Sequence, residues 1–434
     1  MTRVYIETYG CALNRGDTGL MKSLLVRAGY ELVEDPEDAD VIILNTCVVR
    51  YDTEVRMLKR INALYQAALK KGKKLIVAGC MAKALPFTIH ATAPKAILLS
   101  PQNIHRVVEV VRSAAPGEKF IDGTKAYPGI PTYSEGVRAT IPVSEGCLDN
   151  CSFCIVKIAR RDLKSIPIEK VVAAVSQLVK RGVVEIEITG QDLGVYGYDI
   201  YGRSALTDLI ETIISKVEGD YVIRIGQINP QWLSKFLDEL VNVLKDRHVY
   251  KYLHIPVQSG DNKVLKVMNR RYSVEEFEDI VMYLRRKITG IQIATDIIVG
   301  HPREDEKAFT NTIELLTRLE IDRVHIARYS PRPFTSAASM PQIPDPIKKQ
   351  RSRKLEQIYE AVGLSLNSEY VGSLAEVLIT ERGLRPKTVV GRLYNYRPVV
   401  LRGEASKLLG KKAIVEVKKA TFFDLRGELL KLLD

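Results

Sequence analysis

The strongest constraint on the fold is a regular alternation of strand-like and helix-like segments between residues 138 and 330. The strand candidates are residues 138–144, 184–189, 221–228, 252–258, 291–299 and 324–330, and helical patterns cover 168–181, 205–217, 231–244, 274–287 and 304–319. Strands that alternate with helices favour βα units and a parallel sheet. Six such units predict a partial barrel of the (β/α) type, whose chemistry lies at the carboxyl ends of the strands.

The loop after the first strand contains three cysteines in a C-x3-C-x2-C pattern, Cys147, Cys151 and Cys154. Three soft thiolates at this spacing suit one compact soft-metal centre. A closed zinc site needs a fourth ligand, and the nearest histidines lie more than 40 residues away. A redox pair of Cys151 and Cys154 leaves Cys147 unused. An iron–sulfur cluster with one iron open to a small molecule therefore fits best, with zinc and redox chemistry as alternatives.

Residues 1–115 show a second alternation, in which apolar runs at 4–6, 41–44 and 75–78 precede helical patterns at 17–28, 53–70 and 103–112. This pattern predicts an open parallel α/β sheet. Cys11, Cys47 and Cys80 each follow the end of one of these strands. Ligands of open α/β sheets bind beyond the carboxyl ends of the strands, so the three thiols are expected to converge on a second cluster. The alternative is that they are ordinary buried cysteines.

The remaining chain divides into a linker and a basic terminal module. Residues 116–137 are rich in Pro, Gly and Ser and predict a linker, residues 138–369 form the barrel domain, and residues 370–434 are β-rich, as expected of a small barrel. From residue 371 onward there are 13 Lys or Arg against 7 Asp or Glu, within a chain of net charge +12. Basic residues interleaved with aromatics, such as Arg392, Arg397 and Tyr396, favour RNA binding over a plain solvated barrel.

The N-terminus has no secretory apolar region, and no apolar run reaches the length of about 18 residues that a membrane span requires. Six cysteines are too few for a disulfide scaffold in 434 residues, and free metal-binding thiolates suit a reducing compartment. We therefore expect a cytoplasmic protein without a membrane partner.

Together these motifs resemble a known family. The C-x3-C-x2-C pattern with Phe153 before its last cysteine is similar to the signature of the radical S-adenosylmethionine (SAM) enzymes. The upstream cysteines, the segments 254–260, 295–300 and 329–333 and a TRAM-like terminal barrel resemble the methylthiotransferases. Segments 11–17 and 188–197 look most like the archaeal and eukaryotic branch, which acts on N6-threonylcarbamoyladenosine (t6A) in tRNA.

The resemblance implies two 4Fe-4S clusters, with SAM bound at the open iron of the Cys147 trio. The C2 hydrogen of adenine is neither acidic nor hydridic, so a positioned base cannot remove it. A 5′-deoxyadenosyl radical would take it instead, and the second cluster would supply the methylthio group of 2-methylthio-t6A. An electron donor and a sulfur source are implied, without their identity. The expected SAM contacts are Phe153, Gln191, Arg224, Gln258 and Asp296.

The threonylcarbamoyl group carries a carboxylate, which an arginine can bind in bidentate fashion. We hypothesise that one of four arginines predicted on the barrel rim binds it, namely Arg160, Arg161, Arg328 or Arg332. Alternatives are another tRNA adenosine derivative, a ribosomal protein substrate, or a non-enzymatic RNA-binding iron–sulfur protein.

The chain departs from the family pattern at three rim positions. Arg161, Arg303 and Phe334 stand where the family commonly has glycine. These bulkier residues affect the expected pocket shape and leave all six cysteines in place.

Overall fold

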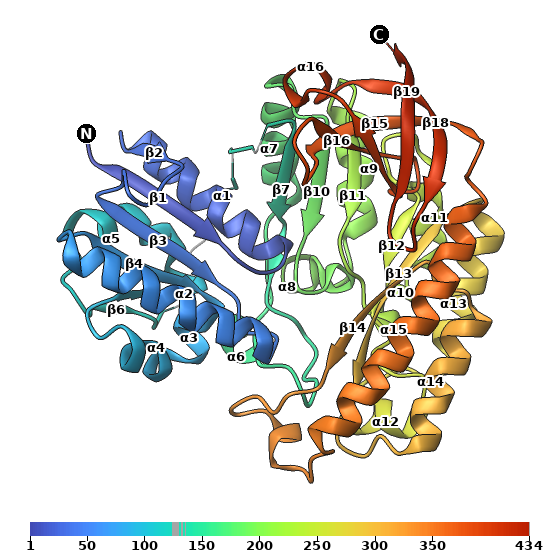
Figure 1. Ribbon diagram of the computed structural model, residues 1–434, viewed down its shortest axis with the longest axis horizontal. Coiled ribbons are helices and arrows are strands. Elements are labelled where there is room, and N and C mark those ends of the chain that lie inside the picture. Colours follow the sequence, from blue (N-terminus) through green and yellow to red (C-terminus); the bar gives the residue numbers. More distant parts are fainter. Residues whose placement is uncertain (124–129, 132, 135, 434) are drawn as a thin grey trace.

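The computed structural model describes residues 1–123, 130, 131, 133, 134 and 136–433, and it shows two α/β units side by side with a small β-barrel above the second (Figure 1). Part of the linker expected at 116–137 falls outside the described residues. Among the residues that are described, no helix has both the length and the apolar character needed to cross a membrane.

The N-terminal unit is a six-stranded parallel sheet. Its strand order is β2 (Glu31–Val33), β1 (Arg3–Thr8), β3 (Val41–Thr46), β4 (Lys74–Gly79), β5 (Ile97–Leu99) and β6 (Lys119–Phe120). One face packs against α1 (Ala12–Arg27), the 3-10 helix η1 (Pro101–Arg106) and α5 (Val107–Ser113), and the other against α2 (Tyr51–Lys70), α3 (Cys80–Ala84) and α4 (Pro86–Thr92). Every residue of β3 is buried, as expected of a strand covered on both faces. The expected open α/β sheet is confirmed, with β2, β5 and β6 as additional short strands.

The central unit is an open barrel of six parallel strands. Two three-stranded sheets are joined by isolated bridges, Ile223 to Val249 and Gln227 to His254. The strands are β7 (Arg138–Pro142), β10 (Glu185–Thr189), β11 (Val222–Ile225), β12 (Tyr252–His254), β13 (Gln292–Val299) and β14 (Arg323–Arg328). Helices α7 (Ile168–Lys180), α9 (Leu206–Lys216), α11 (Leu237–Lys245), α13 (Val274–Lys287) and α14 (Glu306–Arg318) cover the outside (Figure 1).

Local sequence sets where these helices begin. In α13, the Ser273 side chain accepts from the backbone of Glu276, and the Glu276 side chain accepts from the backbone of Ser273. This reciprocal capping box satisfies two backbone donors that the helix itself leaves unpaired. The partial barrel predicted from the six βα units is confirmed.

The N-terminal sheet docks on the barrel through α1, which packs on β7. Gly16 allows this approach, because a Cβ atom there would lie 2.2 Å from the Pro142 ring. Arg15, the neighbour of Gly16 on α1, reaches into the barrel and donates to Glu187 at 2.7 Å. We call the contact between the two units, formed by α1, α3, β7 and the short helix α6 (Val156–Arg160), the seam.

The C-terminal residues form a closed five-stranded barrel after the long helix α15 (Asp345–Ser368). Its strands are β15 (Leu374–Arg382), β16 (Thr388–Arg392), β17 (Pro398–Arg402), β18 (Lys412–Ala420) and β19 (Leu425–Leu433). β19 closes the barrel by pairing with both β17 and β18. This small barrel lies over the amino-terminal ends of the central strands (Figure 1), opposite the ends where chemistry is expected.

Candidate active site

The C-x3-C-x2-C loop lies at the carboxyl end of β7, between the short strand β8 (Ser144–Glu145) and α6. Gly146 begins it with φ 78°, and a Cβ atom there would lie 2.0 Å from the Asp162 carbonyl oxygen, so the turn requires glycine. The backbone N–H of Gly146 donates to the side-chain oxygen of Gln191 at 2.6 Å. The carbonyl of Ser152 accepts from the N–H of Ala337 at 2.9 Å. The loop is therefore held from two sides of the barrel rim, by which we mean the loops at the carboxyl ends of the central strands.

The three thiols of this loop lie in a partly buried setting with hydrogen-bond donors around them. Burial and the nearby Cys151 raise the pKa of Cys154 to about 11, while backbone N–H groups of Lys157 and Val156 act in the opposite direction. The guanidinium of Arg270 donates to the sulfur of Cys151 at 3.3 Å. These donors would stabilise sulfur in the negatively charged form that binds metal.

The N-terminal cysteines converge at the carboxyl edge of their sheet. Cys11 caps the start of α1, Cys47 follows β3 and Cys80 opens α3 directly after β4. Burial raises the pKa of Cys80 to about 12; Arg160 lowers it, and the proximity of Cys11 and Cys47 raises it further. The mutual influence of the three thiols shows that they share one neighbourhood, as the strand register predicts.

The loop trio fits an iron–sulfur cluster, and a second cluster at the N-terminal trio stays a prediction. All six cysteines are free thiols. Within the described residues, no three of these sulfurs come within 4.8 Å of one another, as the ligands of a single zinc ion would. A four-iron cluster binds one thiolate per iron, so its ligands stand further apart, and three thiolates leave one iron open.

Arg160 connects the two trios across the seam. It lies at the end of α6, and its Nε donates to the sulfur of Cys80 at 3.4 Å. Its remaining donors reach Asp17 at 2.5 Å, Glu145 at 3.1 Å and Asn14 at 2.9 Å. Arg160 ends the short helix α6, which begins two residues after Cys154. The two trios therefore face the same seam.

The predicted substrate arginines are mostly occupied by carboxylates of the protein. Arg160 is fully engaged, as described above. Arg328 pairs with Asp52 at 3.2 Å, and Arg332 pairs with Glu54 at 2.5 Å. Arg160 and Arg332 are buried in these pairs, whereas Arg328 and Asp52 form an exposed pair. No observation tests binding of a substrate carboxylate by any of the three, which stays a prediction. Arg161 is exposed, and its side chain has no partner in the described part of the chain.

Four of the five predicted SAM contacts lie near the cysteine loop or on adjoining rim strands. Phe153 packs edge-on against the His301 ring at 6.1 Å between centroids, and Gln191 holds Gly146. Gln258, with φ 71°, accepts from the N–H of Ile298 at 3.0 Å beside Asp296. No observation tests their contact with SAM, which stays a prediction.

Arg224 is placed differently from the expectation. Its guanidinium pairs with Glu187 inside the barrel and stacks on Tyr252 and Tyr396, each at 5.2 Å from the ring centroid. Glu187 also accepts from Arg15, and these arginines hold its pKa at about 2 although burial raises it. Arg224 therefore serves contacts between the central and C-terminal barrels, and no observation tests its predicted role at the methionyl end of SAM.

Tyr396 also corrects the sequence interpretation of the C-terminal module. It is buried between the two barrels, and Arg392 pairs there with Glu381 at 2.5 Å. Arg397 is likewise buried and pairs with Asp322 at 2.8 Å. Tyr396 and Arg397 attach the small barrel to the central one, while Arg392 holds Glu381, which also pairs with Arg138 of β7 at 2.8 Å. The three side chains are therefore engaged within the protein.

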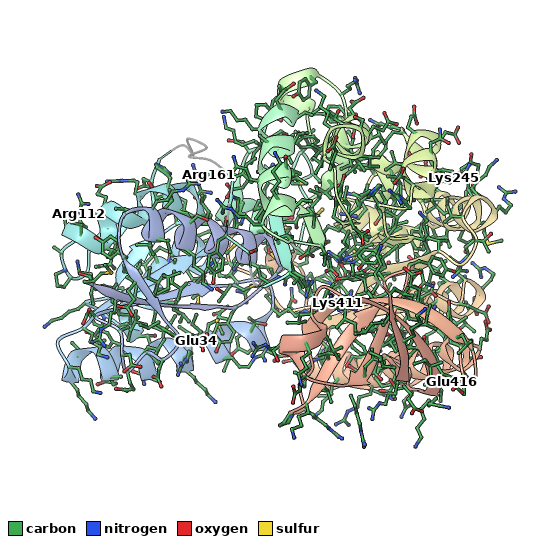
Figure 2. All side chains as sticks on the ribbon, turned by 90° about the horizontal axis from the view of Figure 1, so that it is seen from above. Glu34, Arg112, Arg161, Lys245, Lys411 and Glu416 are labelled. Carbon is green, nitrogen blue, oxygen red and sulfur yellow. The ribbon has the colours of Figure 1, made fainter. Side chains whose placement is uncertain are left out.

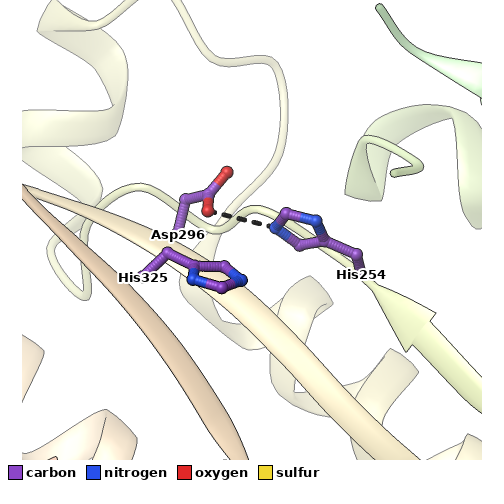
Figure 3. Close-up of side chains that lie close together, drawn as sticks. All are labelled: His254, Asp296 and His325. Atoms are coloured by element: carbon purple, nitrogen blue, oxygen red, sulfur yellow. Dashed lines mark ion pairs between the residues drawn. The ribbon is translucent and has the colours of Figure 1, made fainter. Parts of the chain in front are cut away.

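Three side chains on adjacent strands meet inside the barrel (Figure 3). His254, Asp296 and His325 each offer a ligand atom within 4.8 Å of the others, and the Nε2 of His254 lies 3.1 Å from Asp296. Burial lowers the pKa of His325 to about 4, so this ring is neutral at pH 7. His254 holds the pKa of Asp296 below its usual range despite burial.

Sequence reasoning missed several of these residues. Arg270 lies 119 residues from Cys151, and Asp17 lies 143 residues from Arg160. His325 sits in an ordinary strand-like run and forms part of a site only through its neighbours on β12 and β13. No local pattern marks Arg270 or His325, and segment 11–17 gives no sign of the partner of Asp17, because each acquires its role from a contact between distant segments.

Comparisons with known proteins agree with this geometry. Three family models match successive parts of the chain: an uncharacterized protein family, UPF0004, over residues 3–100, the radical SAM superfamily over 141–316 and the TRAM domain over 368–430. The radical SAM methyltransferase TsrM from Kitasatospora setae, solved with cobalamin and a [4Fe-4S] cluster, has a similar fold. Its TM-score is 0.56 at 14% identity, over 78% of this chain and 74% of that chain.

Two curated relatives match almost the whole chain. A probable threonylcarbamoyladenosine tRNA methylthiotransferase of Pyrococcus abyssi is 40% identical over 439 residues, which cover 99% of this chain and 100% of the relative. A threonylcarbamoyladenosine tRNA methylthiotransferase of Drosophila melanogaster is 34% identical over 441 residues, which cover 99% of this chain and 78% of the relative.

The partial barrel, its three-cysteine loop and the matching family model define a radical SAM protein, a class that uses an iron–sulfur cluster and SAM. Similarity to the two curated relatives over 99% of the chain then identifies one family within this class. The chain belongs to the threonylcarbamoyladenosine tRNA methylthiotransferase family.

Proposed function

We propose that this protein converts t6A in tRNA to 2-methylthio-t6A. The observation that carries the proposal is the position of Arg160, which follows the loop of Cys154 and donates across the seam to the sulfur of Cys80. The names of the relatives and the RNA-binding character of the TRAM module support tRNA as the substrate.

The chemistry needs cofactors, because no side chain can deprotonate C2 of adenine at neutral pH. When bound, SAM and its cluster supply a 5′-deoxyadenosyl radical for hydrogen removal from C2, and a second cluster supplies the methylthio group. Cys147, Cys151 and Cys154 would hold the first cluster, and Cys11, Cys47 and Cys80 the second. Arg270 and Arg160 each place a positive charge against one trio and so offset the charge of the sulfur ligands.

The packing at the seam serves the reaction by fixing geometry. Helix α1 carries Cys11 at its start and packs on β7, the strand that leads into the other trio. Because both sets of ligands belong to rigid, directly packed elements, the distance between the two sites is set by the fold. An electron donor and a sulfur source complete the list of partners that the proposed chemistry requires.

The carboxylate of the threonylcarbamoyl group requires a cation that is free to bind it. Arg161 meets this requirement, since its side chain has no partner within the described residues. Arg50 is a second candidate that sequence reasoning did not consider. It lies three residues after Cys47, is exposed, and is close enough to Asp296 to contribute to its low pKa. We propose that Arg50 or Arg161 binds the substrate carboxylate.

The proposal is tested with protein reconstituted anaerobically with iron and sulfide, then incubated with SAM, a reductant and tRNA that carries t6A. Mass spectrometry of the digested nucleosides should show 2-methylthio-t6A and loss of t6A. In a deletion strain the same nucleoside should disappear from tRNA. If the tRNA nucleosides are unchanged while a ribosomal peptide loses a methylthio group, the alternative protein substrate is correct.

A further inference from the structure

Two exposed residues on the barrel rim have a backbone conformation that normally requires glycine. Phe334, after β14, has φ 63°, and Arg303, after β13, has φ 73°. Positive φ is uncommon for residues with a side chain, particularly for bulky ones. The fold could therefore be built more easily with glycine at both positions.

Nothing within the described protein explains why these side chains are present. Phe334 is 85% exposed, and Arg303 is also exposed. Neither side chain has a hydrogen bond, ion pair or ring contact with the described residues. Strained backbone tends to persist at functional sites, where a binding partner makes use of it. An exposed side chain on strained backbone with no internal contact points to a partner outside the chain.

The loops that carry Phe334 and Arg303 are attached to the cysteine loop. His301, two residues before Arg303, lies 3.3 Å from the hydroxyl of Ser152 and packs on the ring of Tyr329 at 5.1 Å. The segment after Phe334 donates to Ser152 through the N–H of Ala337. A ligand held by these side chains would therefore lie beside the mouth of the barrel.

The N-terminal unit adds a second aromatic residue at this place. Tyr51, the first residue of α2, is 57% exposed. Helix α2 is fixed to the rim by the pairing of Glu54 with Arg332, two residues before Phe334. Tyr51 and Phe334 thus extend from segments that two ion pairs join, Arg332 with Glu54 and Arg328 with Asp52. We call Tyr51, Arg303 and Phe334 the rim platform.

We infer that the rim platform binds unpaired nucleotides that flank the target adenosine. Exposed aromatic rings stack on unpaired bases, and an arginine binds the phosphates between them. The C-terminal barrel lies at the opposite end of the central strands (Figure 1), so its basic residues are remote from the rim. Residues of the rim itself then bind the RNA loop beside the reacting base. The inference rests on the proposed function, because it takes tRNA as the substrate.

The test uses reconstituted full-length protein, an RNA hairpin with the anticodon stem and loop containing t6A, and a fully paired RNA of the same length. Phe334→Gly and Arg303→Gly relieve the backbone, so both variants should melt at or above the wild-type temperature. Phe334→Gly should weaken binding of the hairpin roughly tenfold, as loss of one stacked base predicts. Arg303→Gly should instead reduce the salt dependence of binding by about one phosphate contact.

Phe87 gives a matched control, because it is 81% exposed on α4 of the N-terminal unit and belongs to no part of the rim. Phe87→Ala should bind the hairpin as the wild type does. The inference is overturned if Phe334→Gly also binds as the wild type, or if it loses the paired RNA equally. Conversion of t6A by the wild type is measured in parallel, so a failure of the proposed function is seen separately from a failure of the platform.

Discussion

The Nε of Arg160 lies 3.4 Å from the sulfur of Cys80, although the two residues are 80 positions apart and belong to different units. Arg160 is buried and pairs with Asp17 and Glu145, which are also buried. Arg160→Met would remove this buried positive charge from beside both carboxylates, and breaking a buried pair in this way typically costs about 3–5 kcal/mol. We therefore expect a large fall in the urea midpoint.

A second substitution tests whether the loss comes from the buried charge. The variant Arg160→Met with Asp17→Asn should regain part of the lost stability, because one of the two buried negative charges beside Arg160 is removed together with the cation. Simple addition of the two single effects would contradict this account and would indicate that Arg160 stabilises the seam mainly by packing.

The two cysteine trios should have separable roles. Cys11→Ala is expected to keep the ability to cleave SAM and to lose methylthio transfer, because only the N-terminal trio is broken. Cys151→Ala is expected to lose both activities. Formation of 5′-deoxyadenosine and of 2-methylthio-t6A is measured side by side, together with the iron content of each variant. Equal behaviour of the two variants would refute the division of labour between the trios.

Sequence patterns predicted the architecture well because the relevant signals are local. Six apolar runs separated by amphipathic helices define the barrel, and the C-x3-C-x2-C spacing places three thiols on its first loop. The location of Cys11, Cys47 and Cys80 at the carboxyl ends of three strands could also be predicted, since parallel strands share one carboxyl edge.

The charged contacts were less predictable because a charge reveals its partner only in three dimensions. The partners of Arg224 and Arg332 are Glu187 and Glu54, and Arg224 also stacks on Tyr396 of the small barrel, which lies opposite the rim. Tyr396 looked like a base-stacking residue and is instead buried between the two barrels. Figure 2 shows how densely charged side chains cover the molecule, so an arginine count alone cannot identify a substrate ligand.

Glu187 should make the protein sensitive to acid. Its pKa falls from 4.5 to about 2 in the folded state, so the associated stability is present above pH 4.5 and is lost as the pH falls towards 2. A shift of this size in a buried group corresponds to roughly 3 kcal/mol. The variant Glu187→Gln should be less stable at pH 7 and should show a flatter loss of stability between these pH values. Urea midpoints across this pH range measure the loss of stability. Parallel curves of urea midpoint against pH for the two proteins would exclude Glu187 as the source of that loss.

Recognition of the substrate carboxylate should depend on an arginine without an internal partner. Arg50→Ala and Arg161→Ala are compared for affinity towards RNA hairpins that carry t6A or its methyl ester, which lacks the charge. Wild-type protein should prefer t6A, and the variant that lacks the arginine bound to the carboxylate should lose this preference, by roughly 10-fold to 100-fold for one charge-assisted hydrogen-bonded contact.

Arg56→Ala is the matched control, because Arg56 is an exposed arginine on α2, the helix that begins directly after Arg50. The corresponding lysine variant should keep part of the preference, since it retains the charge without the bidentate geometry. If both alanine variants distinguish the two hairpins as well as the wild type does, neither arginine binds the carboxylate, and the preference must come from donors elsewhere on the rim.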